Sequence, residues 1–383
     1  TDIAQEGLRI PPMRLTREVR ELIVASSRTP VERAGDLDAQ VGANVVGGQR
    51  LAVLDGAPFG EVLDYGERRA VAALTALGDG EWSATDVMDS TGPRADQQHP
   101  ATIRCTITAA NGGLCVDFTG TDPQSTGNVN AVEAVTVSCV EFAMRSALDP
   151  TLPANAGVMR RMRVVAPEGT LVAARFPAAV GAGNVEVSQR IADVCLRALA
   201  EAVPDRVGAA SQGTMNNVLV GGSSLDGSEA WVYYETVAGG QGGRPPGPTG
   251  VALPGMSGVH TGMTNTRNTP VEALERAFPL RVRRQRLRRG SGGAGTARGG
   301  DGLERDLEVL VDVTVSLITE RRTSQPWGLA GGAPGAVGEN WLLPGGDETR
   351  AERLADKCTL HLRAGDVLRM LTPGGGGWGS PAP

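Results

Sequence analysis

The chain has 383 residues, of which 40% are hydrophobic and 21% are charged, a composition typical of a globular protein with more than one hydrophobic core. Its net charge of −6 and its 3% of aromatic residues argue against a nucleic-acid-binding surface. No run of eighteen apolar residues occurs, so the sequence predicts no membrane-spanning helix. Lys357 is the only lysine, which excludes a P-loop from this chain, and the three histidines lie too far apart to form a zinc motif on one helix.

The five cysteines are odd in number and none belongs to a CxxC pair, which indicates reduced, mostly buried thiols in a cytoplasmic protein. The chain opens at Thr1 and shows no secretory leader. Because its first residues read as the continuation of a longer polypeptide, we expect an upstream segment that is missing or is carried on another chain.

Residues 1–95 are predicted to form a mostly helical segment. Thr16 is a suitable N-cap for a first helix, and Pro30 suits the first turn of a second. The stop signal Gly78-Asp79-Gly80 follows a third stretch with helical spacing. Helices are therefore expected over residues 16–27, 30–54 and 60–77.

Residues 96–300 are predicted to form a mixed α/β core. Two strands, over residues 103–107 and 114–118, flank the hairpin signal Asn111-Gly112-Gly113. Long apolar stretches with helical spacing follow. They predict helices over residues 132–148 and 185–202.

Residues 301–383 are predicted to form a β-rich C-terminal region, so the fold class is α+β. Strands are expected over residues 308–313, 314–319, 358–362 and 367–371. The basic run from Arg281 to Arg289 carries arginine on both faces of a strand, which favours an exposed edge strand, with a phosphate or subunit contact as the alternative.

Four segments combine glycines with small polar side chains and could carry chemistry. Solvent loops do not need so many uncharged hydrogen-bonding groups, whereas a pocket for a neutral amide or imide does. Each segment also has a structural interpretation, as a helix cap or a set of turns. The segments cover residues 181–190, 211–217, 234–240 and 258–270.

Within these segments we select candidate site residues. His260 is the best candidate for proton transfer, and Glu235, which ends a predicted strand, is a candidate general base. The candidate substrate-binding residues are Asn184, Glu186, Gln212, Thr214, Asn216, Asn217, Asn265 and Arg267. A further stretch, Thr372–Gly379, is predicted either to bind an anion or to let backbones approach closely.

A set of short strings, spread over nearly the whole chain, has a characteristic order. The strings are Glu6–Pro12, Arg28–Pro30, Gly35–Leu37, Asp117–Thr121, Ala182–Glu186, Ser211–Asn217, Met263–Pro270, Ser291–Gly295, Arg298–Gly302, Pro326–Leu329 and Thr372–Gly379. Together they resemble the hydantoinase B/5-oxoprolinase family, which includes the large subunit of acetone carboxylase.

The resemblance implies a hydantoinase A-type partner that binds ATP and phosphorylates a carbonyl oxygen, after which the B-type subunit completes the opening of a cyclic amide. It implies no cofactor bound by this chain alone, ATP held by the partner, and a divalent metal in an N-terminal region that this sequence lacks. The sequence departs from the family's His-Met-Thr-Asn pattern at Gly262. His260, two residues earlier, would face the same side of an extended segment.

We therefore expect a B-type subunit, or a fragment of one, of a cytoplasmic ATP-dependent hydrolase that acts on carbon–nitrogen bonds in a hydantoin, 5-oxoproline or related lactam. It would act within a hetero-oligomer, with no nucleic-acid or membrane partner. Two alternatives stay open: the large-subunit part of an ATP-dependent ketone carboxylase, and a catalytically incomplete assembly scaffold.

Overall fold

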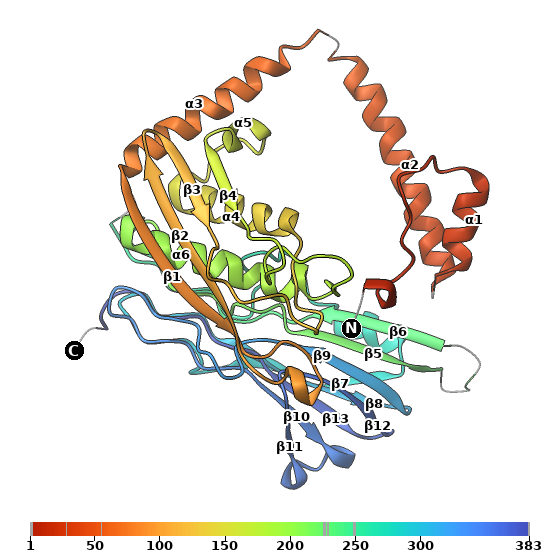
Figure 1. Cartoon of the computed structure of the whole chain (residues 1–383). Helices are drawn as coiled ribbons and strands as arrows, with labels where there is room; N and C mark the ends of the chain where they lie inside the picture. The colour runs from red at the N-terminus through yellow and green to blue at the C-terminus, as the bar shows by residue number, and fades with distance from the viewer. Residues whose placement is uncertain are drawn as a thin grey trace.

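The computed structural model describes residues 3–27, 29–54, 56–224, 227, 230–247 and 250–381. Arg28, which contributes to the family resemblance, lies outside the described residues. The described chain forms an N-terminal helical arm, a sheet that packs on helices, and a β-sandwich (Figure 1). This arrangement confirms the predicted α+β class.

The helical arm contains α1 (Arg17–Ala25), α2 (Pro30–Ala52) and α3 (Phe59–Leu77), after a short 3₁₀ turn, η1 (Ile3–Gln5). Thr16 caps α1 as predicted, because its side-chain oxygen accepts a hydrogen bond from the Val19 amide at 3.4 Å. Within the arm, α1 and α2 project away from the rest of the molecule (Figure 1), whereas α3 packs against that body and buries Ala70 and Leu74. Leu37 is the one buried side chain that the structure records on α2. Most of the apolar side chains along α1 and α2 therefore face solvent.

The first sheet has the strand order β1-β2-β3-β4. The predicted hairpin between β2 and β3 is confirmed, and its turn uses the positive φ angles of Asn111 (52°) and Gly112 (67°). The strands of this sheet are β1 (Gly80–Met88), β2 (Ala101–Ala110), β3 (Gly113–Asp117) and β4 (Met162–Val165), with the 3₁₀ turn η2 (Ala95–Gln97) before β2.

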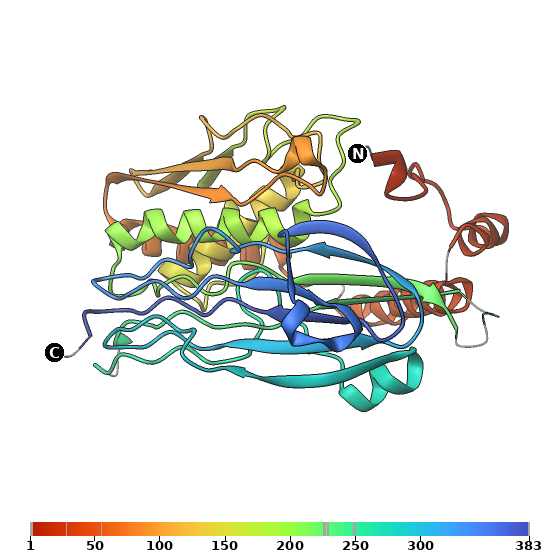
Figure 2. The same ribbon diagram turned by 90° about the horizontal axis from the view of Figure 1, so that it is seen from below.

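The helices α4 (Glu133–Leu148) and α6 (Ser188–Ala202) cover this sheet, and α5 (Ala156–Met159) is a single turn that packs on α3. The first core consists of apolar side chains from β2, β3, α4 and α6. Seen from below, α6 lies between the first sheet and the sandwich (Figure 2), so it is buried along nearly its whole length.

The sandwich packs a sheet of order β11-β10-β13-β8-β7 against a sheet of order β12-β9-β5-β6 around a second apolar core. Its strands are β5 (Asn217–Ser223), β6 (Ala230–Thr236), β7 (Leu280–Arg288), β8 (Gly302–Val309), β9 (Val313–Ile318), β10 (Glu339–Leu343), β11 (Glu352–Leu354), β12 (Lys357–Leu362) and β13 (Val367–Leu371), with α7 (Val271–Ala277) before β7 and the 3₁₀ turns η5 (Pro344–Gly346) and η6 (Glu348–Arg350) after β10.

The structure shifts several predicted boundaries. The helices end at Leu77, and β1 already belongs to the first sheet, while β5, β6 and β7 belong to the sandwich. The sheets therefore cross the boundaries expected at residues 95 and 300, because strand pairing joins segments that are far apart in sequence. The predicted strand over residues 308–313 is wrong in its position, since the chain turns after Val309 and both Val309 and Val313 face the core.

The basic run forms β7, an edge strand as predicted. Its arginines pair with acids of the neighbouring strand: Arg283 Nη2 lies 2.9 Å from Glu308 Oε1, and Arg286 Nε lies 2.7 Å from Glu304 Oε2. The outer face of this sheet is thus a ladder of opposite charges, which leaves these arginines less available for a phosphate than the sequence alone indicated.

Glycine-rich extended segments pack backbone against backbone beneath α6, with the C-terminal segment 372–379 at their centre. The amides of Gly374 to Gly379 all donate to carbonyl oxygens of other segments, as in the bonds from Gly375 to Gly300 at 2.9 Å and from Gly376 to Ala210 at 2.8 Å. No amide of this run is left to bind an anion, so of the two predictions for it the close approach of backbones is confirmed.

None of the described helices is both long enough and apolar enough to cross a lipid bilayer.

We expect Gly375→Ala to lower the free energy of unfolding by at least about 1–3 kcal/mol, since a Cβ there would collide with the backbone carbonyl of Gln241. The matched control is Gly42→Ala in the middle of α2, where a Cβ meets open space and should raise stability by about 0.5–1 kcal/mol. Urea unfolding measures both. Equal midpoints for the two variants would contradict the packing described here.

Candidate functional site

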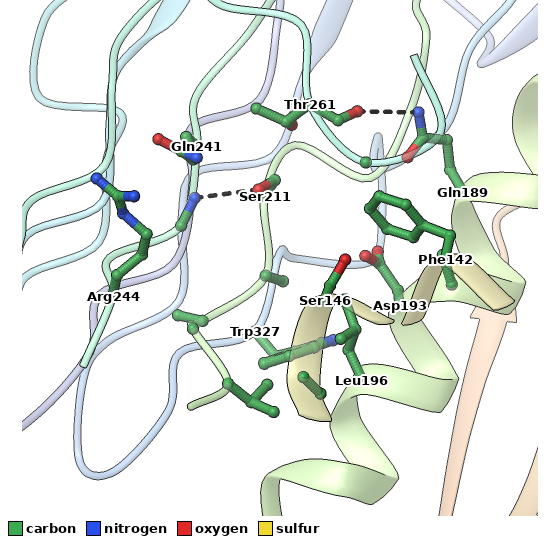
Figure 3. A pocket seen from close by; sticks show the side chains of 18 of the residues that line it. Phe142, Ser146, Gln189, Asp193, Leu196, Ser211, Gln241, Arg244, Thr261 and Trp327 are labelled. Atoms are coloured by element: carbon green, nitrogen blue, oxygen red, sulfur yellow. Dashed lines mark hydrogen bonds between the residues drawn. The ribbon is translucent and has the colours of Figure 1, made fainter. Parts of the chain in front are cut away.

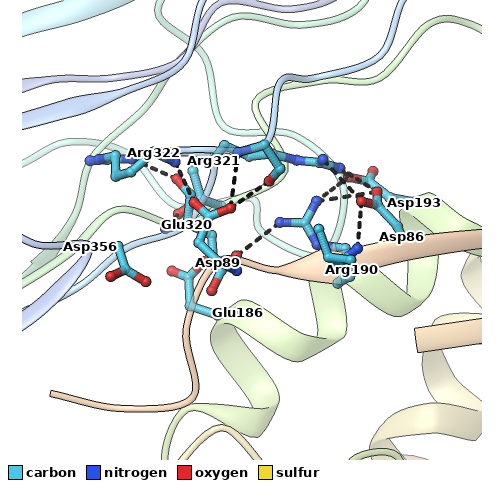
Figure 4. Close-up of polar contacts among 12 residues, drawn as sticks. Asp86, Asp89, Glu186, Arg190, Asp193, Glu320, Arg321, Arg322 and Asp356 are labelled. Carbon is cyan, nitrogen blue, oxygen red and sulfur yellow. Dashed lines mark hydrogen bonds and ion pairs between the residues drawn. The ribbon is translucent and has the colours of Figure 1, made fainter. Parts of the chain in front are cut away.

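A cluster of buried charged side chains lies where the first sheet, α6 and the sandwich meet (Figure 4). Its members come from elements that are distant in sequence. They are Asp86 and the half-buried Asp89 at the end of β1, Glu186, Arg190 and Asp193 around the start of α6, Glu320, Arg321 and Arg322 after β9, and Asp356 and Lys357 at the start of β12.

The guanidinium groups of Arg190 and Arg321 hold this cluster together. Arg321 Nη2 donates at 2.8 Å to Asp86 Oδ2 and at 2.8 Å to Asp193 Oδ2. Arg190 Nη2 donates at 3.0 Å to Glu320 Oε2. Burial alone would raise the pKa of Asp86, but the two arginines outweigh it and lower that pKa to about 2. Asp86 is therefore ionised at neutral pH.

Lys357, the only lysine of the chain, is completely buried in the same cluster. Its ammonium group donates to Glu320, to Asp356 Oδ2 at 3.0 Å and to the Thr319 carbonyl at 3.4 Å. Burial opposes the charge on this group, but Glu320 and Asp356 outweigh burial and raise the pKa of Lys357. An ammonium presents three tetrahedrally arranged donors, which suits this compact set of acceptors better than a planar guanidinium.

The predicted polar residues of the first two segments meet beside this cluster. Asn217 Nδ2 donates to Glu186 Oε1 at 2.7 Å, and Asn216 Nδ2 donates to Gln212 Oε1 at 2.8 Å. The Thr214 hydroxyl oxygen accepts from the Glu320 amide at 3.1 Å. These side chains are buried, so they form an internal network rather than an open binding surface.

Glu186 lies in a π-helical turn, η3 (Gly183–Val187), directly before α6. Its Oε2 atom is buried and has no hydrogen-bond partner among the described residues. Burial, reinforced by the nearby Glu320 carboxylate, raises the pKa of Glu186 to about 8. Glu186 is therefore mostly protonated at neutral pH and acts as a neutral acid within the network.

The candidate base Glu235 has no free carboxylate oxygen. Arg305 Nη1 lies 2.6 Å from Oε2, which also accepts from the Tyr233 hydroxyl. The Thr269 amide donates to Oε1 at 2.6 Å. Both carboxylate oxygens of Glu235 are therefore engaged by groups of the protein, and neither is left free to face a substrate.

The remaining predicted residues are His260, Asn184, Asn265 and Arg267. His260 is half-buried, with Nδ1 at 3.4 Å from the Thr266 hydroxyl and with Nε2 buried without a partner among the described residues. Burial lowers the pKa of His260, partly offset by Glu235, which favours the neutral imidazole. The other three are exposed: Asn184, Asn265 and Arg267.

A cavity of about 220 Å³ opens between α4, α6 and the glycine-rich segments (Figure 3). It continues outward into a more open space of about 690 Å³, with which it shares Arg206 and Arg244 at its mouth. Apolar side chains form much of its wall. The lining includes Phe142, Ala147, Ala192, Leu196, Val207 and Trp327, with the polar residues Ser146, Gln189, Asp193, Ser211, Gln241 and Thr261.

Two polar atoms of lining residues are buried without a hydrogen-bond partner in the described part of the chain, namely Trp327 Nε1 and Thr261 Oγ1. An unsatisfied buried polar group costs about 1–3 kcal/mol, so such groups commonly mark a place where a ligand completes the bonding. Asp193 adds a carboxylate that is fixed from one side by Arg321.

Segments singled out in the sequence reach this cavity, but through residues other than those selected. Gln189, Ser211 and Thr261 come from three of the four segments, and Gln241 directly follows the fourth. Phe142, Asp193 and Trp327 were not selected, although Trp327 belongs to one of the quoted strings. The one signal for Asp193 was its charge, and that of Arg190 one turn earlier, within a largely apolar helical stretch.

No group of three or more His, Cys, Asp or Glu side chains in the described residues is placed to hold a metal ion. We therefore derive no step through a metal from these residues.

These features define the chain as an α+β protein with a small, partly apolar cavity beside a buried ion network. The sequence matches the hydantoinase B/oxoprolinase family over residues 1–381, and the chain belongs to that family.

Among its relatives, an uncharacterized protein of Methanocaldococcus jannaschii is 39% identical over 394 residues, covering 99% of this chain and 66% of the relative. The 5-oxoprolinase 1 of Arabidopsis thaliana is 41% identical over 278 residues, covering 73% of this chain and 20% of that protein. The chain thus spans about two thirds or less of the length of these relatives.

Two solved structures share the fold. The ATP-dependent caprolactamase from Pseudomonas jessenii superposes with a TM-score of 0.83 at 25% identity, covering 98% of this chain and 67% of that one. Acetone carboxylase in its nucleotide-free form superposes with a TM-score of 0.82 at 18% identity, covering 99% and 57%. The second likeness shows the fold alone.

Replacing Lys357 by methionine should cost about 3–5 kcal/mol of stability, because the Glu320 and Asp356 carboxylates would then be buried without their shared cation. The control is Arg17→Met, which breaks the exposed Arg17–Glu21 pair and should cost below about 1 kcal/mol. Urea unfolding at pH 7 compares the two. A Lys357 variant as mildly affected as the control would show that the cluster tolerates an unpaired charge.

Glu186→Gln should change the pH dependence of stability. The folded-state pKa of Glu186 is about 8 and its ordinary value is 4.5. Between these two pH values the folded chain therefore retains a proton that the unfolded chain has released. The stability from this proton is complete below pH 4.5 and is lost as the pH rises to about 8. The wild type should lose up to roughly 1.4 kcal/mol per pH unit from this group relative to the variant. Urea unfolding from pH 5 to pH 9 tests this, and parallel curves would refute it.

Proposed function

We propose that this chain is the B-type subunit, or part of one, of an ATP-dependent hydrolase that opens a cyclic amide such as a hydantoin, 5-oxoproline or another lactam. The observation that carries the proposal is the cavity between α4 and α6, which combines apolar walls with the unpartnered donor Trp327 Nε1 and the Asp193 carboxylate. Its volume of about 220 Å³ suits one small ring. The family membership of the chain supports the same class of substrate.

An amide is a poor electrophile, so ring opening needs activation before water can attack. In the proposed reaction an A-type partner transfers the γ-phosphoryl group of ATP to the carbonyl oxygen of the ring. Water then adds to the carbon, and the carbon–nitrogen bond breaks as the nitrogen takes up a proton, which leaves an acyl phosphate. A second water hydrolyses the acyl phosphate to the carboxylate and phosphate. Overall the ring, ATP and two waters yield the open-chain amino acid, ADP and phosphate.

The division of labour follows from the sequence. The chain has no P-loop because its single lysine, Lys357, stands outside any such motif, so ATP is assigned to the partner. The caprolactamase that shares this fold is itself named ATP-dependent. The subunit described here would bind the ring and orient it, within a cytoplasmic hetero-oligomer.

The buried ion network contributes rigidity to this task. Asp193 and Arg190 are one helical turn apart on α6, and Arg321 joins Asp193 to Asp86 of the first sheet. A carboxylate held by a fixed guanidinium cannot rotate freely, so the cavity keeps its shape before the ring binds, which lowers the entropic cost of binding.

Blocking the cavity should abolish turnover without unfolding the chain. We expect Ser146→Trp, at the exposed mouth, to reduce ATP-dependent ring opening at least 10-fold in the complex with the A-type subunit. The matched control is Ser138→Trp, two helical turns earlier on α4 and exposed away from the cavity, which should behave as the wild type. Ring opening is followed by chromatography of the amino-acid product. Absence of turnover on every lactam and hydantoin by a correctly assembled wild-type complex would sink the proposed function.

A further inference from the structure

We propose that Asp193 and Trp327 recognise the two halves of the ring amide: the Asp193 carboxylate accepts the ring N–H, and the Trp327 indole N–H donates to the ring carbonyl. The cavity is thereby specific for rings with an unsubstituted amide nitrogen. This inference rests on the proposed function, and it assigns recognition roles to two residues that were not among the candidate site residues selected from the sequence.

Asp193 presents a fixed carboxylate to the cavity. Its Oδ2 atom accepts from Arg321 at 2.8 Å, and the same guanidinium donates at 3.2 Å to the Gln325 carbonyl. The structure gives the other oxygen, Oδ1, no hydrogen bond from any described residue, and Asp193 lines the cavity. In Figure 3 the Asp193 carboxylate and the Ser146 hydroxyl point toward the space between the lining residues. One acceptor atom is therefore committed to the protein and the other remains for a ligand.

The backbone is shaped to hold this carboxylate in place. Gly213 has a φ of +62°, and a Cβ on it would lie 2.7 Å from Asp193 Oδ2 and 2.8 Å from Arg321 Nε. A side chain at this position would disturb the ion pair, so the glycine lets the Ser211–Asn217 segment pass directly over it. The orientation of Asp193 thus depends on contacts from Arg321 and from the Ser211–Asn217 segment.

Trp327 supplies the complementary donor. Indole nitrogen can only donate, and Nε1 of Trp327 is buried with no acceptor among the described residues. Figure 3 shows this nitrogen on the side of the ring that faces α4 and α6. The backbone of Trp327 is anchored in the glycine-rich bundle, since its carbonyl accepts from the Ala210 amide at 2.9 Å. The donor is therefore both unpaired and immobilised.

The Asp193 acceptor and the Trp327 donor are complementary to the two polar groups of one amide, and the apolar walls are complementary to the rest of the ring. A ring amide carries one N–H and one C=O, and its methylene groups suit the walls formed by Phe142 and Leu196. A methyl group on the ring nitrogen would remove the hydrogen bond and place an apolar group against a buried carboxylate. Because a hydrogen bond to a charged partner contributes about 1.5–3 kcal/mol, the N-methyl ring should bind about 10- to 100-fold more weakly.

Calorimetric titration of the purified chain tests this with a panel of five- to seven-membered lactams and their N-methyl counterparts. The wild type should prefer each unsubstituted ring by about 10- to 100-fold. Asp193→Asn should reduce that preference below about 3-fold, whereas Trp327→Phe should weaken both members of each pair by about 10-fold and keep the preference. Asp306→Asn, which alters another buried aspartate in an ion pair with Arg369 far from the cavity lining, should leave all affinities unchanged.

The outcomes separate the two proposals. Binding of no ring at all, together with no turnover by the complex, removes the proposed function and this inference with it. Binding of unsubstituted and N-methyl rings with equal affinity overturns the inference and leaves the proposed function standing. If Asp193→Asn does not fold, as judged by circular dichroism, the ring pairs on the wild type and on Trp327→Phe still decide the matter.

Discussion

The pairing of buried charges between α6 and the turn after β9 is the constraint on which the remaining structure depends. Arg190 and Glu320 are fully buried and Asp193 is nearly so, which means that each needs a partner inside the protein. The partners come from the first sheet and from the sandwich, which means that the two halves of the fold can meet in one register only. Apolar packing alone would tolerate small shifts, whereas an unpaired buried charge would not.

The cavity lies at the same seam, and this position explains its mixed character. Its apolar wall is an extension of the first core through α4 and α6, and its polar part is the edge of the ion network through Asp193. Side chains that hold the halves together thus also set the chemistry of the space between them. The glycine-rich bundle completes the lining, because close backbone packing leaves the ring of Trp327 room at the cavity wall.

Local features of the fold could be predicted from the sequence, and tertiary ones could not. The N-cap at Thr16, the turn at Asn111 and the edge strand of arginines follow from short-range chemistry and were confirmed. The sequence marked Glu186 and Asn217 as polar candidates, but it did not predict that the two side chains form a hydrogen bond with each other. Whether such residues line a cavity or join an internal network depends on how deeply they are buried. That burial is set by strands distant in sequence, as when Asn217 donates to the Ile318 carbonyl, 101 residues away. Asp193 and Trp327 illustrate this, since nothing adjacent in sequence marks them as neighbours.

The burial of Lys357 has a practical side. As the sole lysine, with no exposed surface, it leaves the folded chain without any lysine side chain that acylating or cross-linking reagents could reach. Such reagents would gain access to that amine only when the seam between the two halves opens. The labelling rate of one residue would then report directly on how often the protein comes apart at its ion network.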